Sequence, residues 1–228
     1  MDLQYIPEIL FEDNHLLVVH KPANMPVQAD SSNDPDLQNA LKSYLIEKYN
    51  KPGDAFLGIV HRLDRPTSGV MVFAKTSKAA SRLSDQFRRR KVSKTYWAIV
   101  EGNPPQKGTL NDYLWKDRDT NVVHVKDKHH PQAKPAILSY KSIGFSDGLS
   151  LLEIELETGR SHQIRVQFST AGFPLWGDYK YGNTNQPQNR TLALLSCQIG
   201  FNHPTKKDFM QFKTNLPAEH PWNLFKLA

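Results

Sequence analysis

The sequence has few of the residues and patterns on which several large protein classes depend. Cys197 is the single cysteine among 228 residues, so no intrachain disulfide can form, which suits a reducing cytosol. No group of Cys and His residues has the spacing of a zinc site, and no glycine-rich phosphate loop is present. The N-terminal residues include Asp2, Pro7 and Glu8 and lack the apolar run of a signal peptide or membrane span. The single cysteine and the N-terminal residues predict a soluble, cytoplasmic protein.

The composition is that of a folded protein with a surplus of positive charge. Hydrophobic residues make up 39% of the chain, which is enough to bury a core. The 29 Lys and Arg residues outnumber the 23 Asp and Glu residues, giving a formal net charge of +6 and a pI of about 9.3. A basic balance favours a polyanionic partner, which is RNA, DNA or an anionic membrane surface.

The apolar residues recur in short runs of mixed period, which is typical of an α+β protein. No internal repeat or clear linker divides the sequence, so we expect one domain over residues 1–228. Leu37, Leu41 and Leu45 have helical spacing, and Ser77 can cap a second helix. We expect strands at 9–11, 16–19, 57–60, 70–74, 95–100, 151–156 and 210–212, helices at 37–49, 77–91 and 161–171, and loops at 22–35, 116–134 and 183–189.

Two segments carry unusual amounts of charge. The second helix ends in Arg88, Arg89, Arg90 and Lys91, and cations are favoured at a helix C-terminus by its dipole. This run fits a phosphate-binding patch and a solvated helix end equally well. The polar segment 116–134 predicts an exposed hairpin or insertion.

The clearest chemical pattern lies between two expected strands, in the segment 61–69. Asp64 stands between Arg62 and Arg65, and a carboxylate close to cations stays ionised at neutral pH. Such a group suits a nucleophile or an electrostatic stabiliser and suits a general acid poorly. Pro66 restricts the backbone and Gly69 widens its range, so the loop has a specified shape. Taken alone, the pattern also fits a structural aspartate paired with a neighbouring arginine in a tight turn.

The segment 61–75 closely resembles the catalytic motif of the RluA-type pseudouridine synthases, which isomerise uridine in RNA. Residues 94–102 resemble the second motif of that family, and residues 158–166 resemble the third. The segments 9–13 and 16–22 resemble its N-terminal strand pair, and residues 174–182 extend the match. The resemblance covers about 9–204, so we expect a single catalytic domain without the N-terminal RNA-binding domain of many relatives. It implies the pseudouridine synthase fold, a mixed and mainly antiparallel sheet with flanking helices and a central basic cleft.

The resemblance also implies roles for individual residues. Asp64 matches the essential catalytic aspartate of the family. Tyr96 matches the tyrosine that stacks on the target base and is the proposed acceptor of the proton lost from its ring. Arg165 matches the basic residue that pairs with the aspartate. We expect further contacts with the substrate from residues of the same motifs, which are His61, Arg62, Leu63, Arg65, Thr67, His162 and Ile164.

The third motif falls on the expected helix 161–171. At helical spacing, Ile164 and Phe168 share a face that suits a core, and His162 and Arg165 share a different face that suits a cleft. The chain departs from the usual family residue at four places, and these are Gln167 for His, His20 for Asn, Asn24 for Gly, and Leu195–Ser196 for His-Ala.

The resemblance implies a uridine flipped out of ribosomal or transfer RNA, with no metal, cofactor, membrane or obligate protein partner. Asp64 attacks the anomeric carbon or adds to the ring in one route, and in the other it removes a ribose proton to give a glycal; both remain open. A non-catalytic RNA-binding protein on the same fold is one rival hypothesis, and it predicts binding without product. A glycoside or nucleoside hydrolase is another, but such enzymes usually use a second carboxylate. Glu101 and Glu157 are the acidic residues available near the second and third motifs.

Overall fold

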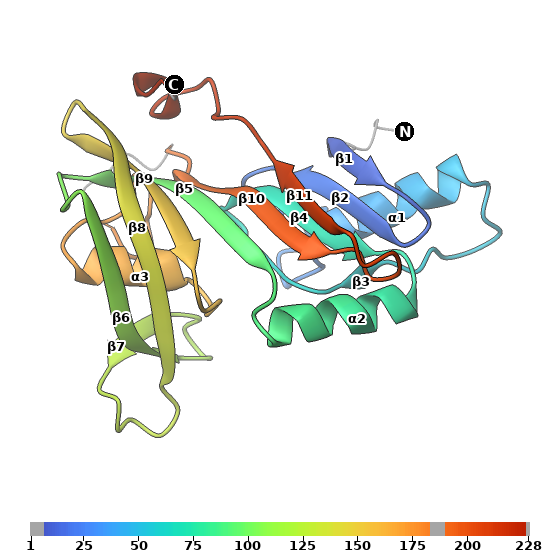
Figure 1. Ribbon diagram of the computed structural model, residues 1–228, viewed down its shortest axis with the longest axis horizontal. Coiled ribbons are helices and arrows are strands. Elements are labelled where there is room, and N and C mark those ends of the chain that lie inside the picture. Colours follow the sequence, from blue (N-terminus) through green and yellow to red (C-terminus); the bar gives the residue numbers. More distant parts are fainter. Residues whose placement is uncertain (1–6, 183–189, 227–228) are drawn as a thin grey trace. The chain divides into compact units, whose positions relative to one another are not determined.

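The computed structural model describes residues 7–182 and 190–226, and the chain divides into two compact units (Figure 1). The first unit contains Met1–Ser93 and Ser196–Thr214, and the second contains Lys94–Leu195 and Asn215–Ala228. The expected loop at 183–189 lies outside the described residues. Strands and helices both occur in each unit, so the α+β prediction is confirmed, whereas the single domain stays a prediction.

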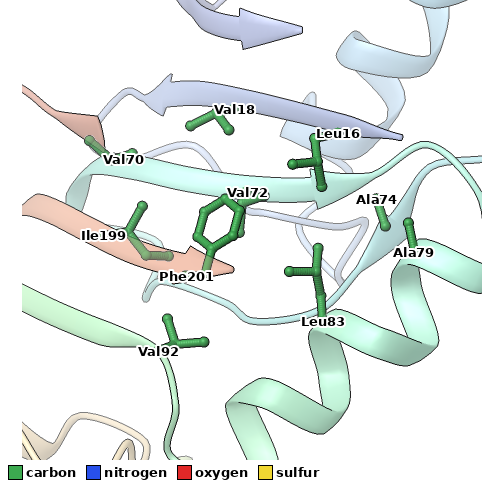
Figure 2. Packing of buried hydrophobic residues seen from close by; sticks show 10 residues of the cluster. All are labelled: Leu16, Val18, Val70, Val72, Ala74, Ala79, Leu83, Val92, Ile199 and Phe201. Atoms are coloured by element: carbon green, nitrogen blue, oxygen red, sulfur yellow. The ribbon is translucent and has the colours of Figure 1, made fainter. Parts of the chain in front are cut away.

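The first unit is built on a mixed sheet whose strand order is β1-β2-β4-β10, with β3 beside β4 and β11 beside β10. The pairs β1-β2, β2-β4, β3-β4 and β10-β11 are antiparallel, whereas β4 and β10 point the same way (Figure 2). These strands are β1 (Ile9–Glu12), β2 (Leu16–Lys21), β3 (Gly58–Ile59), β4 (Ser68–Ala74), β10 (Leu194–Asn202) and β11 (Phe209–Lys213). The first two residues of β10 belong to the second unit. The carboxylate of Asp13 shapes the turn between β1 and β2, because its Oδ1 accepts the N–H groups of His15 at 2.7 Å and Leu16 at 2.8 Å. The expected strand pair around this turn is therefore confirmed.

Two helices belong to the first unit, and a side chain caps each N-terminus. In α1 (Leu37–Lys48), Asp36 accepts the N–H of Asn39 at 3.0 Å. In α2 (Ser77–Arg88), the cap is Thr76, whose Oγ1 accepts the N–H of Ala79 at 3.2 Å. The prediction that Ser77 caps this helix was wrong by one residue, because Thr76 has the extended backbone that a cap requires.

The apolar face of α2 packs on the sheet. Leu83 of α2 lies beside Leu16, Val72 and Phe201, and each of these four side chains is fully buried (Figure 2). Burial of each side chain of this size contributes roughly 1.5–3 kcal/mol. This cluster fixes α2 against β2, β4 and β10, and so positions the segment between β3 and β4.

The second unit has the strand order β5-β9-β8-β6-β7, and all of these pairs are antiparallel. Its strands and helices are β5 (Ser93–Glu101), β6 (Lys107–Lys116), β7 (Val123–Lys126), β8 (Lys134–Ser146), β9 (Leu149–Leu156), α3 (Gln163–Thr170) and the 3-10 helix η1 (Trp222–Leu224). Residue Ser93 of β5 belongs to the first unit. The pairing of β6 with β7 confirms the exposed hairpin expected within 116–134.

Helix α3 packs against the strands of the second unit. Val166 lies with Leu114, Val123 and Ala136 in one buried cluster. The backbone of Gly172 has a φ of +86°, so this residue ends the helical segment as expected.

Candidate active site

Asp64 lies on a tight turn between β3 and β4. The N–H of Thr67 donates to the carbonyl oxygen of Asp64 at 3.0 Å, which closes the turn. Leu63 and Thr67 are buried, whereas Asp64 is partly exposed and Arg62 is exposed. The hydroxyl of Thr67 has no hydrogen-bond partner among the described residues. Buried anchors on both sides thus hold the partly exposed Asp64 on a fixed turn.

Gly69 allows this segment to enter β4 directly against β10. Its φ is +117°, and a Cβ at this position would lie 2.3 Å from the carbonyl oxygen of Ser196. The expectation that Gly69 supplies backbone freedom is therefore confirmed, and the close approach to β10 adds a second reason for glycine.

His61 is held by the scaffold of the first unit. Its Nε2 accepts the N–H of Val72 at 3.1 Å, so Nδ1 carries the proton of the neutral ring. The ring stacks on Phe87 of α2 with 4.7 Å between centroids and 19° between planes. These contacts give His61 a structural task, and its contact with substrate stays a prediction.

Lys21, at the end of β2, ties the turn to the preceding loop and was not identified from the sequence. Its side chain is fully buried, and Nζ donates to the carbonyl oxygens of Pro22 at 2.8 Å, Met25 at 2.7 Å and Arg65 at 2.9 Å. Burial lowers the pKa of Lys21 to about 7, while the negative charge of Asp64 acts in the opposite direction. Lys21 therefore holds the residue next to Asp64 and contributes positive charge close to its carboxylate.

Arg65 pairs with the loop that precedes α1. Its guanidinium forms an ion pair with Asp34, donates to Ser32 Oγ at 3.0 Å through Nη1, and donates to the Asn24 carbonyl at 3.1 Å through Nε. Asn24, which stands where the family usually has Gly, has a φ of +64°. Arg65 thus fastens the Asp64 turn to this loop, and its contact with the substrate stays a prediction.

In the second unit, Arg165 is paired with a residue that the sequence did not single out as functional. Arg165 Nε donates to Asp178 Oδ2 and Nη2 donates to Asp178 Oδ1, both at 2.7 Å. Asp178 Oδ1 also accepts the N–H groups of Lys180 at 3.0 Å and Tyr181 at 3.1 Å. A two-point pair of this kind fixes the plane of the guanidinium, so Asp178 positions Arg165. The signal available in the sequence was that Asp178 lies in the segment 174–182, which extends the resemblance to the family.

The predicted core face of the third motif is confirmed, because Ile164 and Phe168 are buried, whereas its cleft face stays a prediction. Residues 163–168 are all buried, so Arg165 is as deeply enclosed as its neighbour Ile164. His162 has a left-handed backbone with a φ of +52° and precedes the helix. Its Nδ1 lies 2.5 Å from the hydroxyl of Tyr181. Tyr96 is buried in β5 opposite Ile154 of β9.

The predicted site residues are divided between the units. Asp64 and the rest of its turn belong to the first unit, and Tyr96, Arg165, His162 and Ile164 belong to the second. Their convergence around one uridine, like the central basic cleft, stays a prediction.

Two other features are absent from residues 7–182 and 190–226. No group of three or more His, Cys, Asp or Glu side chains in this part of the chain could hold a metal ion. None of the helices described there is long and apolar enough to cross a membrane.

Comparisons with known proteins agree with the resemblance of the motifs. The family model described as RNA pseudouridylate synthase matches residues 15–170. The ribosomal large subunit pseudouridine synthase D of Zymomonas mobilis is 37% identical over 227 residues, which cover 95% of this chain and 71% of that protein. An uncharacterised RNA pseudouridine synthase of Bacillus subtilis, YhcT, is 35% identical over 216 residues, covering 93% and 69% of the two chains.

A solved structure has the same architecture. The human RNA pseudouridylate synthase domain containing 4 protein superposes with a TM-score of 0.78 at 26% identity, covering 92% of this chain and 88% of that one. This confirms the expected pseudouridine synthase fold. With matching motifs, a matching fold and relatives along nearly its whole length, the chain belongs to the family of RNA pseudouridine synthases.

Proposed function

We propose that the chain converts specific uridines of ribosomal or transfer RNA to pseudouridine, with Asp64 as the catalytic residue. The names of relatives from Zymomonas mobilis and Yersinia pestis refer to the large ribosomal subunit, which makes its RNA the first substrate to test. The family membership supports the reaction, and the position of Asp64 supports its role.

The observation that carries the proposal is a partly exposed carboxylate on a turn held from several sides. Thr67 closes the turn by its backbone, and Lys21 binds the carbonyl of Arg65 beside Asp64. Such anchoring keeps a reacting group oriented before substrate arrives, which lowers the entropic part of the barrier.

In the proposed reaction, the target nucleotide first leaves the RNA stack. Unstacking costs a few kcal/mol and is cheapest in loops and single strands. The bond from the ring nitrogen N1 to the ribose carbon C1′ then breaks, the base turns, and a bond forms between C5 and C1′. C5 loses a proton and N1 gains one, so atoms and electrons balance within the RNA.

Three residues divide this chemistry. Asp64 either attacks the anomeric carbon or the ring, or removes a ribose proton to give a glycal. Arg165, oriented by Asp178, keeps Asp64 ionised, because a nearby cation favours the charged form of a carboxylate. Tyr96 stacks on the base and accepts the proton that leaves C5.

The proposal includes RNA as the partner and a cytoplasmic location, where ribosomal and transfer RNA are found. It includes no metal, cofactor or obligate protein partner, because an isomerisation exchanges no electrons or groups with a second substrate.

Purified Asp64→Asn tests the proposal. We expect pseudouridine formation in transcribed large-subunit ribosomal RNA or transfer RNA to fall at least about 100-fold, with RNA affinity retained, because the carboxylate acts in the chemical step. Release of tritium from C5-labelled uridine measures the reaction. Asp54→Asn is the matched control, since Asp54 is exposed on another loop of the same unit and pairs with Lys42.

Three results would contradict the proposal. Wild-type turnover by Asp64→Asn would remove the catalytic role from this residue. RNA binding by the wild-type protein without product would favour a non-catalytic binding protein, and release of free uracil would favour a hydrolase.

A further inference from the structure

Exposed cations gather on a part of the first unit that we call the α2 basic surface. It consists of the exposed cationic side chains on α2, on the residues that follow it, and on the turn between β10 and β11. Its members are Lys78, Arg82, Arg88, Arg89, Arg90, Lys91, Lys206 and Lys207. The segments 76–91 and 202–208 contain two acidic residues, Asp85 and Asp208. Eight of the 29 basic and two of the 23 acidic residues therefore lie here, and this surface carries the whole formal net charge of +6.

Hydrogen bonds hold the two segments of this surface together. Arg82 Nη1 donates to the carbonyl oxygen of Pro204 at 2.8 Å. The side-chain amide of Gln86 donates to the carbonyl of Asn202 at 2.8 Å and accepts its N–H at 3.0 Å. Figure 1 shows the turn after β10 next to α2. Cations more than one hundred residues apart in the sequence thus belong to one built surface.

His203 holds the backbone of the turn that carries Lys206. The ring of His203 is buried, and its Nδ1 accepts the N–H groups of Thr205 at 3.2 Å and Lys206 at 2.9 Å. Because Nδ1 accepts, the proton lies on Nε2, which donates to Asp13 Oδ2 at 2.9 Å. Binding to this turn therefore requires little ordering of the backbone, which lowers the entropic cost of association.

The α2 basic surface adjoins the turn that carries Asp64. Phe87 of α2 stacks on His61, which is three residues before Asp64. Arg88 follows Phe87 directly, so the run of cations at the end of α2 begins where the helix contacts the catalytic segment. A ligand held by this run would therefore lie close to the segment that carries Asp64.

We propose that the α2 basic surface binds the phosphate backbone of the substrate RNA beside the flipped uridine. This inference rests on the proposed function and adds a docking site outside the catalytic pocket. The backbone of α2 rises about 15 Å from Lys78 to Arg88, which is long enough to follow several phosphates. Contacts of this kind set the register of the RNA and add affinity without reading its sequence.

RNA fits this surface better than an anionic membrane does. Membrane-binding surfaces combine cations with a broad apolar face that enters the lipid. Two large apolar side chains next to these segments are exposed in the described part of the chain, Phe209 at 63% and Phe56 at 51%, and two rings are far smaller than such a face. An exposed aromatic ring among cations suits stacking on an unpaired base.

The double variant Lys206→Glu with Lys207→Glu tests the inference on the full chain. Both side chains are exposed, so the fold should be retained. The matched control is Lys51→Glu with Lys213→Glu, which makes the same charge change at exposed lysines of the same unit outside the α2 basic surface. The probes are a short RNA duplex, whose binding needs no flipped uridine, and vesicles of phosphatidylglycerol, each measured over a series of salt concentrations.

We expect the Lys206/Lys207 variant to bind the duplex at least about tenfold more weakly than the control does. We also expect the slope of log affinity against log salt concentration to fall in magnitude by about 1 to 2 relative to the control. Duplex binding equal to that of the control would overturn the inference. So would loss of vesicle binding with unchanged duplex binding, since that result would assign the surface to lipid. Pseudouridine formation by the wild type and the control variant is measured in parallel. Its absence would contradict the proposed function without touching the binding result.

Discussion

Replacement of Gly69 by alanine tests how the turn that carries Asp64 is held against β10. The added Cβ would lie 2.3 Å from the carbonyl oxygen and 2.7 Å from the backbone nitrogen of Ser196. Both atoms belong to a buried strand and cannot swing aside as a flexible side chain would. Forcing such a contact costs about 1–3 kcal/mol, and placing alanine at a φ of +117° costs about 1–3 kcal/mol more. We therefore expect Gly69→Ala to lower the free energy of unfolding by about 2–6 kcal/mol, a large part of a typical stability of about 5–15 kcal/mol.

Gly53→Ala separates the two contributions. Gly53 has a φ of +130°, but a Cβ there would meet nothing within 4 Å. This control carries the backbone strain without the steric contact, so we expect it to lose about 1–3 kcal/mol. Urea denaturation followed by circular dichroism measures both variants. Equal losses in the two variants would refute the argument that close contact with β10 requires glycine at this position.

Two further predictions concern buried ion pairs. Burial acts to raise the pKa of Glu12, but hydrogen bonds from Lys48, Lys75 and two tyrosines outweigh it and lower the pKa to about 2. Since the folded pKa lies below the unfolded value of about 4.5, Glu12→Gln should cost about 1–3 kcal/mol of unfolding free energy at pH 7, because water around Lys48 weakens part of the interaction. This difference should shrink as the pH falls from 4.5 towards 2, and an equal difference at pH 7 and pH 3 would contradict the prediction. Asp178→Asn leaves the buried guanidinium of Arg165 without its charged partner, so we expect a loss of about 3–5 kcal/mol in urea denaturation together with slower pseudouridine formation, and an unchanged urea midpoint would rule this out.

Elements with strong local signals could be predicted from the sequence. The apolar runs around Asp13 predicted β1 and β2, because a turn residue there separates two β-rich segments. The spacing of Leu37, Leu41 and Leu45 predicted α1, and these three leucines are its buried face. Such features depend on residues close together in the chain, so the sequence displays them directly.

Other elements depend on contacts that a single sequence does not display. Strand β10 was not predicted, because Ser196, Gln198 and Gly200 interrupt its apolar pattern. Most of this strand is buried because β4 and β11 flank it in the first unit, and that placement is a property of the whole fold.

The same limit applies to the site. The motifs predicted Asp64, Tyr96 and Arg165 as site residues, but the residues that hold Asp64 and Arg165 in place come from other segments. A lysine at the end of a strand is usually exposed. Lys21 is buried instead, and three carbonyl groups accept hydrogen bonds from its amine. Asp178 acquires its role only through the pair it forms with Arg165 across thirteen residues.

Mapping of pseudouridine across total RNA tests the central claim most directly. Three strains without the native gene are compared. The first carries no added copy, the second carries a wild-type copy, and the third carries an Asp64→Asn copy. We predict that one or more uridines of ribosomal or transfer RNA are modified with the wild-type copy and remain uridine with Asp64→Asn expressed at the same level. Modification restored by Asp64→Asn, or identical maps with and without the wild-type copy, would contradict the account.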